Sequence, residues 1–217
     1  LSTAVKYIRQ AHQSAAKEAK DLFAMAKNPF LYLTVLVNEM PTEVRERPAE
    51  IALPHSIYGA EFNTRCFFIT TNQFKKTNKA ALQALGPNWK CVSYDQFSKK
   101  YHQYKDRLAI LKDNELFFCD QRIQSILRKH CGVHFFRQKK YPYGIDFSEL
   151  VEAQTERIEE DKLKEVMQNA VERHTYFSQG NGPEYGVKVA RMDGIGDNQI
   201  LKNCKAALKG LLEVLIG

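Results

Sequence analysis

The chain has 217 residues, of which 44% are hydrophobic and 26% are charged, a balance that is typical of a globular protein with one large or two small domains. Its formal net charge of +7 favours an anionic partner such as nucleic acid. Apolar runs of about ten residues or fewer and the lack of a charged-then-apolar leader argue against a membrane-spanning or secreted protein.

The first part of the chain is predicted to form one helix and two strands. Apolar residues at helical spacing, with Ala, Lys and Glu between them, predict a helix over 2–27 that Asn28 and Pro29 end. Leu, Val and Tyr favour a strand over 30–40, and a charged loop separates it from a second strand over 50–58.

The middle part predicts repeated β-then-α units and therefore a small three-layer α/β domain with a parallel sheet. The expected strands are 65–70, 90–94, 116–119 and 133–136. The expected helices are 74–85, a long polar helix over about 95–112, and an amphipathic helix from Ile123 to the stop at Gly132.

The last part is predicted to contain an acidic helix over 147–171, a hairpin of strands 173–177 and 185–192, and an amphipathic helix over 198–216. Charge separates this part from the middle, because residues 62–138 hold 14 Lys and Arg against 5 Asp and Glu, whereas the remainder holds 18 against 20. We therefore expect an inserted inner domain over 62–138 and an outer domain built from 1–61 and 139–217.

Three local patterns resemble the ribosomal protein L-one superfamily. They are Leu-Pro-His at 53–55, the segment 117–145 with Lys-Lys-Tyr-Pro at 139–142, and Val-Lys-Val-Ala at 187–190 before the last helix. The resemblance implies a two-domain α/β fold, with an outer α/β domain from both chain ends and an inserted three-layer, Rossmann-like parallel α/β domain. The compact exit at 139–145 looks more like the nucleolar assembly factors of this superfamily than like the ribosomal stalk protein.

The resemblance implies a non-enzymatic rRNA-binding assembly factor that acts in the nucleolus on a pre-ribosomal particle. Its partners would be ribosomal RNA or pre-rRNA and pre-ribosomal assembly proteins, with no small-molecule substrate. The stalk ribosomal protein is the alternative within the family, and the lack of the family's Thr-Met-Gly-Pro strand before Gly217 argues against it. A protein–protein adaptor and a nucleotide-binding α/β module are alternatives of another class.

Basic residues near the expected hinge are the first candidates for RNA contacts. Lys139 and Lys140 would clamp phosphates, or they are a solvated pair. Arg45 and Arg47 lie in the loop before the Leu-Pro-His motif, where acidic neighbours also suit a simple solubility role.

Three further candidates lie on predicted strands. Lys188 and Arg191 are three residues apart, so their side chains are expected on opposite faces, and at most one of them would meet RNA. Phe30 would stack on a base, although core packing is its commoner role.

Metal-binding and catalytic patterns are weak. His130, Cys131 and His134 have metal-like spacing but lack a fourth ligand nearby in the sequence. No nucleophile and base are paired, so we expect no metal, no cofactor and no enzymatic activity. The five cysteines are isolated from one another, which predicts buried free thiols in a reducing compartment.

Overall fold

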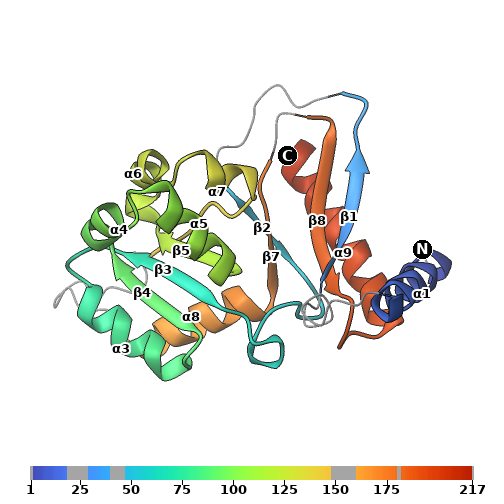
Figure 1. Ribbon diagram of the computed structural model, residues 1–217, viewed down its shortest axis with the longest axis horizontal. Helices are drawn as coiled ribbons and strands as arrows, with labels where there is room; N and C mark the ends of the chain where they lie inside the picture. The colour runs from blue at the N-terminus through green and yellow to red at the C-terminus, as the bar shows by residue number, and fades with distance from the viewer. Residues whose placement is uncertain (1, 19–28, 40–46, 148–159, 180–181, 217) are drawn as a thin grey trace. The chain divides into compact units, whose positions relative to one another are not determined.

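The computed structural model describes residues 2–18, 29–39, 47–147, 160–179 and 182–216 (Figure 1). Residue contacts divide the chain into two compact units. Unit 1 consists of Leu1–Val44, Glu50–Ile57 and Glu172–Gly217, and unit 2 consists of Arg45–Ala49 and Tyr58–Val171. Among the described residues, no helix combines the length and the apolar character that crossing a membrane requires.

In its described residues, unit 1 combines two pairs of strands with two helices. Strand β1 (Phe30–Leu36) pairs antiparallel with β8 (Glu184–Arg191), and β2 (Ala49–Ala52) pairs with β7 (His174–Phe177). Helix α9 (Asp197–Ile216) packs on β8 and contacts α1 (Ser2–Glu18). Its buried face is made of residues at helical spacing: Ile200, Asn203, Cys204, Ala207 and Leu211.

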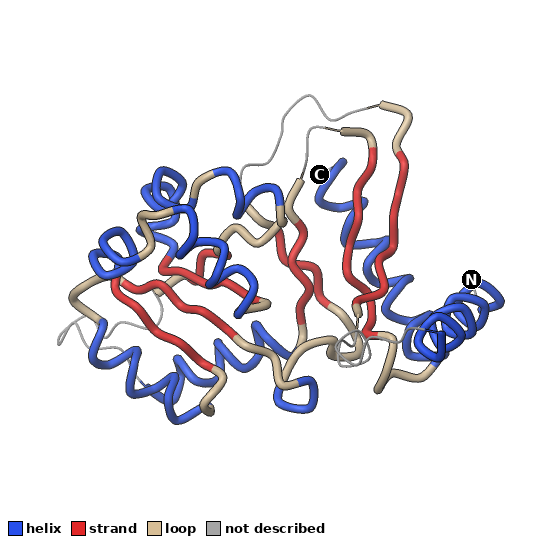
Figure 2. Tube along the Cα trace, viewed as in Figure 1, coloured by secondary structure: helices blue, strands red, loops and turns tan. Residues whose placement is uncertain are grey.

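Unit 2 is a parallel sheet with the strand order β4-β3-β5-β6 (Figure 2). Its strands are β3 (Cys66–Thr70), β4 (Trp89–Ser93), β5 (Leu116–Asp120) and β6 (Tyr143–Ile145). Its helices are α3 (Lys75–Leu85), α4 (Tyr94–Lys100), α5 (Tyr104–Asp113), α6 (Gln121–Cys131), α7 (Val133–Arg137) and α8 (Glu160–Glu172), with a short 3-10 turn at Ala60–Phe62. Every residue of β3 and β5 is buried, as expected for central strands covered on both faces. The expected α/β fold with a parallel sheet is confirmed.

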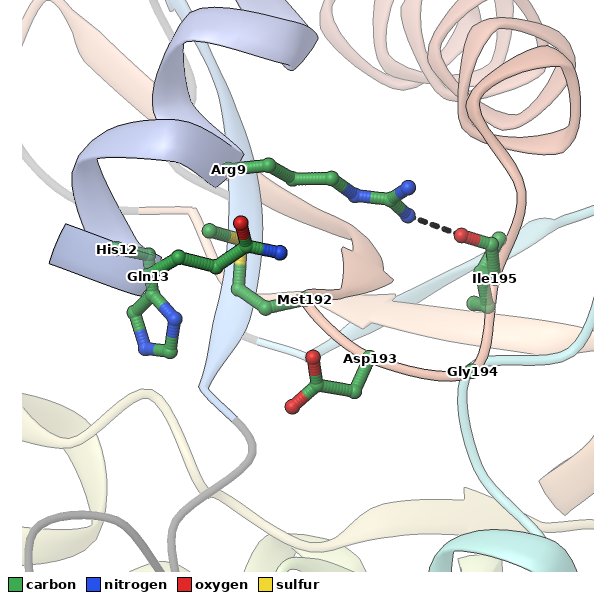
Figure 3. Close-up of a pocket in the computed structure, with 7 residues that line it drawn as sticks. All are labelled: Arg9, His12, Gln13, Met192, Asp193, Gly194 and Ile195. Atoms are coloured by element: carbon green, nitrogen blue, oxygen red, sulfur yellow. Dashed lines mark hydrogen bonds between the residues drawn. The ribbon is translucent and has the colours of Figure 1, made fainter. Parts of the chain in front are cut away.

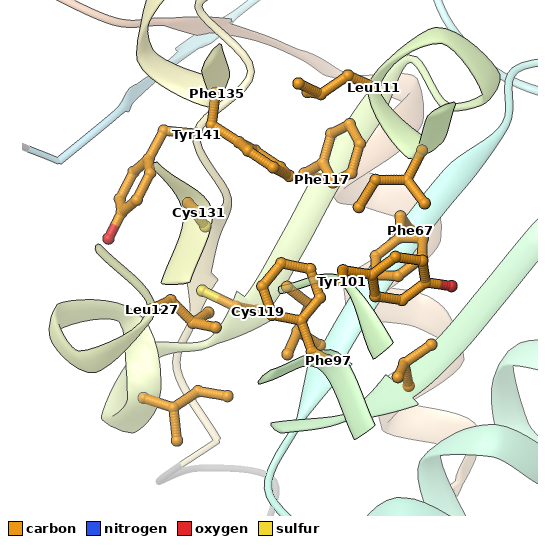
Figure 4. Packing of buried hydrophobic residues seen from close by; sticks show 14 residues of the cluster. Phe67, Phe97, Tyr101, Leu111, Phe117, Cys119, Leu127, Cys131, Phe135 and Tyr141 are labelled. Carbon is orange, nitrogen blue, oxygen red and sulfur yellow. The ribbon is translucent and has the colours of Figure 1, made fainter. Parts of the chain in front are cut away.

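The core of unit 2 is rich in aromatic rings (Figure 4). The Phe67 ring packs against Phe117 at 5.6 Å and against Tyr101 at 5.9 Å between centroids. Phe135 of α7 meets Phe117 edge-on at 5.2 Å, so this short helix adds a ring to the same cluster.

Two of the expected elements of unit 2 are different in the structure. Residues 133–136 form the helix α7 rather than a strand, with Phe135 buried and Val133 60% exposed. A short segment with three apolar residues among four fits either element, and here a single buried position on one face suits a helical turn. The single helix expected over 95–112 is two helices, α4 and α5, with a break that begins at Tyr101. Tyr101 is buried, and the Arg107 Nε stabilises the break by donating to the Tyr101 carbonyl at 2.9 Å.

The expected strand–helix–strand unit consists of β5, α6 and β6. Strand β6, and not residues 133–136, pairs in parallel with β5. Residues 143–145 therefore join the sheet of unit 2, and this unit extends to Val171, well beyond the boundary expected near 139. In unit 1, β7 and β8 contact each other, but in the described ladders β7 pairs with β2 and β8 pairs with β1 instead of forming the expected hairpin.

Candidate nucleic-acid interface

A β-bulge places two predicted RNA-binding cations on the same face of unit 1. Phe30 is opposite Arg191 in the β1–β8 ladder and Tyr32 is opposite Lys188, with a register shift between Leu31 and Tyr32. Phe30 and Tyr32 share one face of β1 because side chains alternate along a strand. The extra residue in β8 therefore resets its alternation, and the prediction that Lys188 and Arg191 point to opposite faces is wrong.

The two cations lie against the Phe30 ring. The Lys188 Nζ is 4.4 Å from the ring centroid, and the Arg191 Cζ is 4.3 Å from it. These distances are within the range of favourable cation–π contacts. Tyr32, on the same face of the ladder, is 54% exposed. An aromatic ring beside a basic group can stack on a base while the cation meets a phosphate.

Arg191 and Lys188 differ in exposure. Arg191 is buried, and its Nε donates to the carbonyl of Ile57 at 2.9 Å. Its guanidinium therefore ties β8 to the segment that follows the Leu-Pro-His motif. Lys188 is half-buried. Of these two cations, Lys188 is the one placed to meet a ligand.

A buried asparagine, Asn203, supports the bulge, and it lies outside the motifs that the sequence brings to notice. Asn203 of α9 donates from Nδ2 to the carbonyls of Val189 and His55, both at 2.9 Å, and its Oδ1 accepts from the His55 N–H at 3.0 Å. Val189 lies at the register shift, so this side chain holds the bulge and the Leu-Pro-His segment together. A polar residue on the apolar face of a predicted helix was the signal that would have identified it.

The two lysines at 139 and 140 differ in their contacts. The Lys140 Nζ donates to the carbonyls of Leu111 and Asn114, at 2.6 and 2.8 Å, where α5 ends. Carbonyls at a helix C-terminus lack intrahelical partners and attract cations. Lys139 is exposed and has a left-handed backbone with φ of 53°. Lys140 thus has a structural role at the end of α5, whereas Lys139 remains a candidate for an RNA contact.

Of the two arginines in the predicted loop, the structure describes only Arg47. Arg45 is outside the described residues, and Arg47 is exposed. Burial raises the pKa of Tyr141, and the positive charge of Arg47 is among the opposing influences, so Arg47 lies within electrostatic reach of that ring in unit 2. Contact of either arginine with RNA stays a prediction.

The residues with metal-like spacing have separate partners. The His130 Nε2 is 2.9 Å from the Tyr94 hydroxyl, and the His134 ring is 4.5 Å from the Tyr104 ring. Cys131 is buried, which raises its pKa to about 12. Within the described residues, no three His, Cys, Asp or Glu side chains are grouped as a metal would require.

A small cavity of about 190 Å³ lies between α1 and the segment that follows β8 (Figure 3). Arg9 borders it, donates to the Ile195 carbonyl and forms an ion pair with Asp197 at 2.7 Å. Because these contacts join α1 to the start of α9, we interpret the cavity as part of the packing of unit 1.

Known proteins share this sequence pattern over nearly the whole chain. Residues 9–216 match the family model described as the Ribosomal protein L1p/L10e family. Ribosomal L1 domain-containing protein 1 of Mus musculus is 26% identical over 141 residues, which cover 62% of this chain and 31% of that protein. The chain thus spans about a third of the length of this relative. The resemblance inferred from the sequence is confirmed, and the chain belongs to the ribosomal protein L1p/L10e family.

Proposed function

We propose that this chain is a non-enzymatic rRNA-binding factor that acts during ribosome assembly. The observation that carries the proposal is the aromatic and basic face of the β1–β8 ladder, which comprises Phe30, Tyr32, Lys188 and Arg191. Membership of a ribosomal protein family supports the same conclusion. The RNA would be ribosomal RNA or its precursor.

The β1–β8 face would recognise a folded RNA by shape and backbone rather than by a long base sequence. Lys188 would contact a phosphate, and Tyr32 would stack on an exposed base or a sugar. Phe30 and Arg191 would hold these two groups in position, because the Phe30 ring contacts both cations and Arg191 is anchored to Ile57. The chemistry of this face needs no cofactor.

The cellular setting that we propose is the nucleolus, on a pre-ribosomal particle that also contains other assembly proteins. The Mus musculus relative is named as a protein that contains the ribosomal L1 domain and not as a ribosomal protein, and we propose that this chain likewise acts outside the mature stalk. Imaging of a fluorescent fusion should show nucleolar enrichment, and an even cytoplasmic distribution with mature ribosomes would favour the stalk alternative.

A direct binding experiment tests the proposed function. Anisotropy of labelled structured rRNA fragments should increase on titration with the full chain, and a GTP or ATP analogue should not compete. Tyr32→Ala should weaken binding by about 1 kcal/mol or more, the loss expected for one stacked base. Tyr7→Ala is the matched control, since Tyr7 is a 73% exposed tyrosine of α1 and lies outside the β1–β8 ladder. RNA binding that survives Tyr32→Ala unchanged would contradict the assignment of this face.

A further inference from the structure

A basic cavity lies in unit 2, beside strand β4. Its volume is about 460 Å³. It is lined by β4 residues and by residues of α4 and its C-terminal end: Lys90, Cys91, Val92, Gln96, Lys99, Lys100 and Tyr101. Three of these are lysines and none is acidic, so the cavity is suited to a ligand with negative charge.

The cavity borders the edge of the sheet, because β4 is the first strand in the order β4-β3-β5-β6 (Figure 1). The Asn88 carbonyl accepts from the Cys66 N–H at 3.0 Å and so points toward β3. Main-chain groups alternate in direction along a strand, so those of Lys90 and Val92 also point toward β3, and those of Cys91 point outward. In the part of the chain that the structure describes, no strand pairs with this outer edge.

Lysines flank the edge on both faces of the sheet. On the α4 side, the Lys90 Nζ lies 5.6 Å from the Phe67 ring and 5.8 Å from the Tyr101 ring, and the Lys100 Nζ lies 5.7 Å from the Tyr101 ring. On the α3 side, burial raises the pKa of the Cys91 thiol and the positive charges of Lys79 and Lys75 oppose this rise, so both lysines lie within electrostatic reach of Cys91. The acid nearest in sequence, Asp95, accepts a hydrogen bond from Asn72 at 2.6 Å.

We propose that the β4 edge binds an extended acidic segment of a partner protein, which pairs as an additional strand with its carboxylates among these lysines. Side chains of an added strand would alternate between the two faces and could meet Lys99 and Lys100 on one and Lys75 and Lys79 on the other. A nucleic acid would use the lysines but would leave the outward main-chain groups of Cys91 without a strand partner. The edge therefore fits a peptide better than RNA.

A synthetic peptide serves as the probe. A labelled peptide of about ten residues, in which pairs of Glu alternate with pairs of Thr so that carboxylates lie on both faces of a strand, should bind the full chain. The control has the same sequence with its four central residues as D-amino acids, which keeps the charge but prevents regular strand pairing. We expect the all-L peptide to bind about tenfold more tightly or better. Equal binding of the two peptides, or no binding of either, would overturn the proposal.

Charge reversals locate the binding site. Lys99→Glu combined with Lys100→Glu should weaken binding of the all-L peptide about tenfold. The matched control is Lys202→Glu combined with Lys205→Glu, which changes the net charge equally at exposed positions of α9 in unit 1. Equal losses from the two double variants would mean that bulk charge governs binding, which contradicts a site at β4.

Amide hydrogen exchange tests the edge itself without any substitution. Binding of the all-L peptide should slow exchange of the Cys91 amide, because this N–H points outward and would gain a strand partner. An unchanged Cys91 amide, alongside peptide binding, would contradict strand addition. A further outcome would overturn the proposal in favour of RNA: structured RNA binds, Lys99→Glu with Lys100→Glu weakens it, and the peptide does not compete. Failure of these tests would leave the β1–β8 face unaffected, since that face belongs to unit 1.

Discussion

Two adjacent lysines, Lys139 and Lys140, illustrate how identical side chains acquire different roles. The Lys140 amine donates to two carbonyls at the end of α5, across 29 and 26 residues of sequence. Nothing in the sequence near position 140 announces these partners. A basic pair that reads as a phosphate clamp therefore contains one structural residue, and charge reversal of both lysines together would mix a folding defect with any effect on RNA.

Lys140→Met should lower the free energy of unfolding by about 1–3 kcal/mol, because two carbonyls lose their charged donor. Lys139→Met is the matched control and should change stability by less than about 0.5 kcal/mol, as is usual for an exposed position. Urea denaturation followed by circular dichroism measures both. A Lys140 variant as stable as the Lys139 variant would show that the bonds at the end of α5 contribute nothing.

Asn203 is the residue on which the geometry of the β1–β8 face depends most. Asn203→Asp keeps the acceptor for the His55 N–H but replaces the donor to two carbonyls with a carboxylate oxygen. We expect a loss of about 2–4 kcal/mol in stability, together with weaker RNA binding at temperatures where the variant remains folded. Asn198→Asp, at an exposed position of the same helix, is the control. Normal stability of the Asn203 variant would contradict its role in holding the bulge.

At the scale of elements, the apolar pattern predicted most helices and strands, and tertiary pairing decided the rest. The bounds of the strands predicted at 65–70 and 116–119 are correct to within one residue. Strands that are buried on both faces have nearly continuous apolar sequences, which are easy to recognise. Residues 133–136, which have three apolar residues and His134, form α7 instead, since a four-residue pattern is too short to distinguish the two elements.

The bulge in β8 could not have been predicted from the alternation of its residues. Sequence alternation assigns Lys188 and Arg191 to opposite faces, whereas the register shift against β1 brings both to Phe30. A bulge is a property of two paired strands, and its support comes from Asn203 in a third element. The candidate residues of the site were therefore visible in the sequence, but their relative placement was not.

Gly210 marks a close approach between α9 and β2. A Cβ added there would lie 2.7 Å from the Cγ2 of Ile51, which is buried and branched at Cβ. Gly210→Ala should therefore destabilise unit 1, against the gain of about 1 kcal/mol that alanine gives inside a helix. In an Ile51→Ala background, which removes the clashing methyl group, Gly210→Ala should become stabilising. The same sign in both backgrounds, measured by thermal unfolding, would contradict the close approach.

At the scale of the whole molecule, buried thiols link stability to pH. Burial raises the pKa of Cys131 to about 12, and it raises the pKa of Cys66 and Cys119 in the same direction from the ordinary value of 9.0. Below pH 9 both states hold these protons, so the stabilisation is complete. Above pH 9 the unfolded chain loses protons that the folded chain keeps, and the free energy of unfolding decreases as pH rises.

The expected decrease is at most about 1.4 kcal/mol per pH unit for each fully buried thiol. Urea unfolding between about pH 8 and pH 10, in the presence of a reductant, should show this slope. Cys131→Ala should make the slope shallower. A free energy of unfolding that rises with pH across this interval would contradict burial of the thiols in their neutral form.

The central claim is that the β1–β8 face of unit 1 contacts RNA, and the salt dependence of binding tests it most directly. The affinity of the full chain for a structured rRNA fragment should fall linearly with salt on logarithmic axes. Lys188→Glu should weaken binding and reduce the magnitude of that slope by about one, the change expected for one lost phosphate contact. Lys202→Glu, the same charge change on α9, should leave the slope within error of the unaltered chain. Equal effects of the two variants would contradict the claim, because they would mean that net charge, and not this face, determines RNA binding.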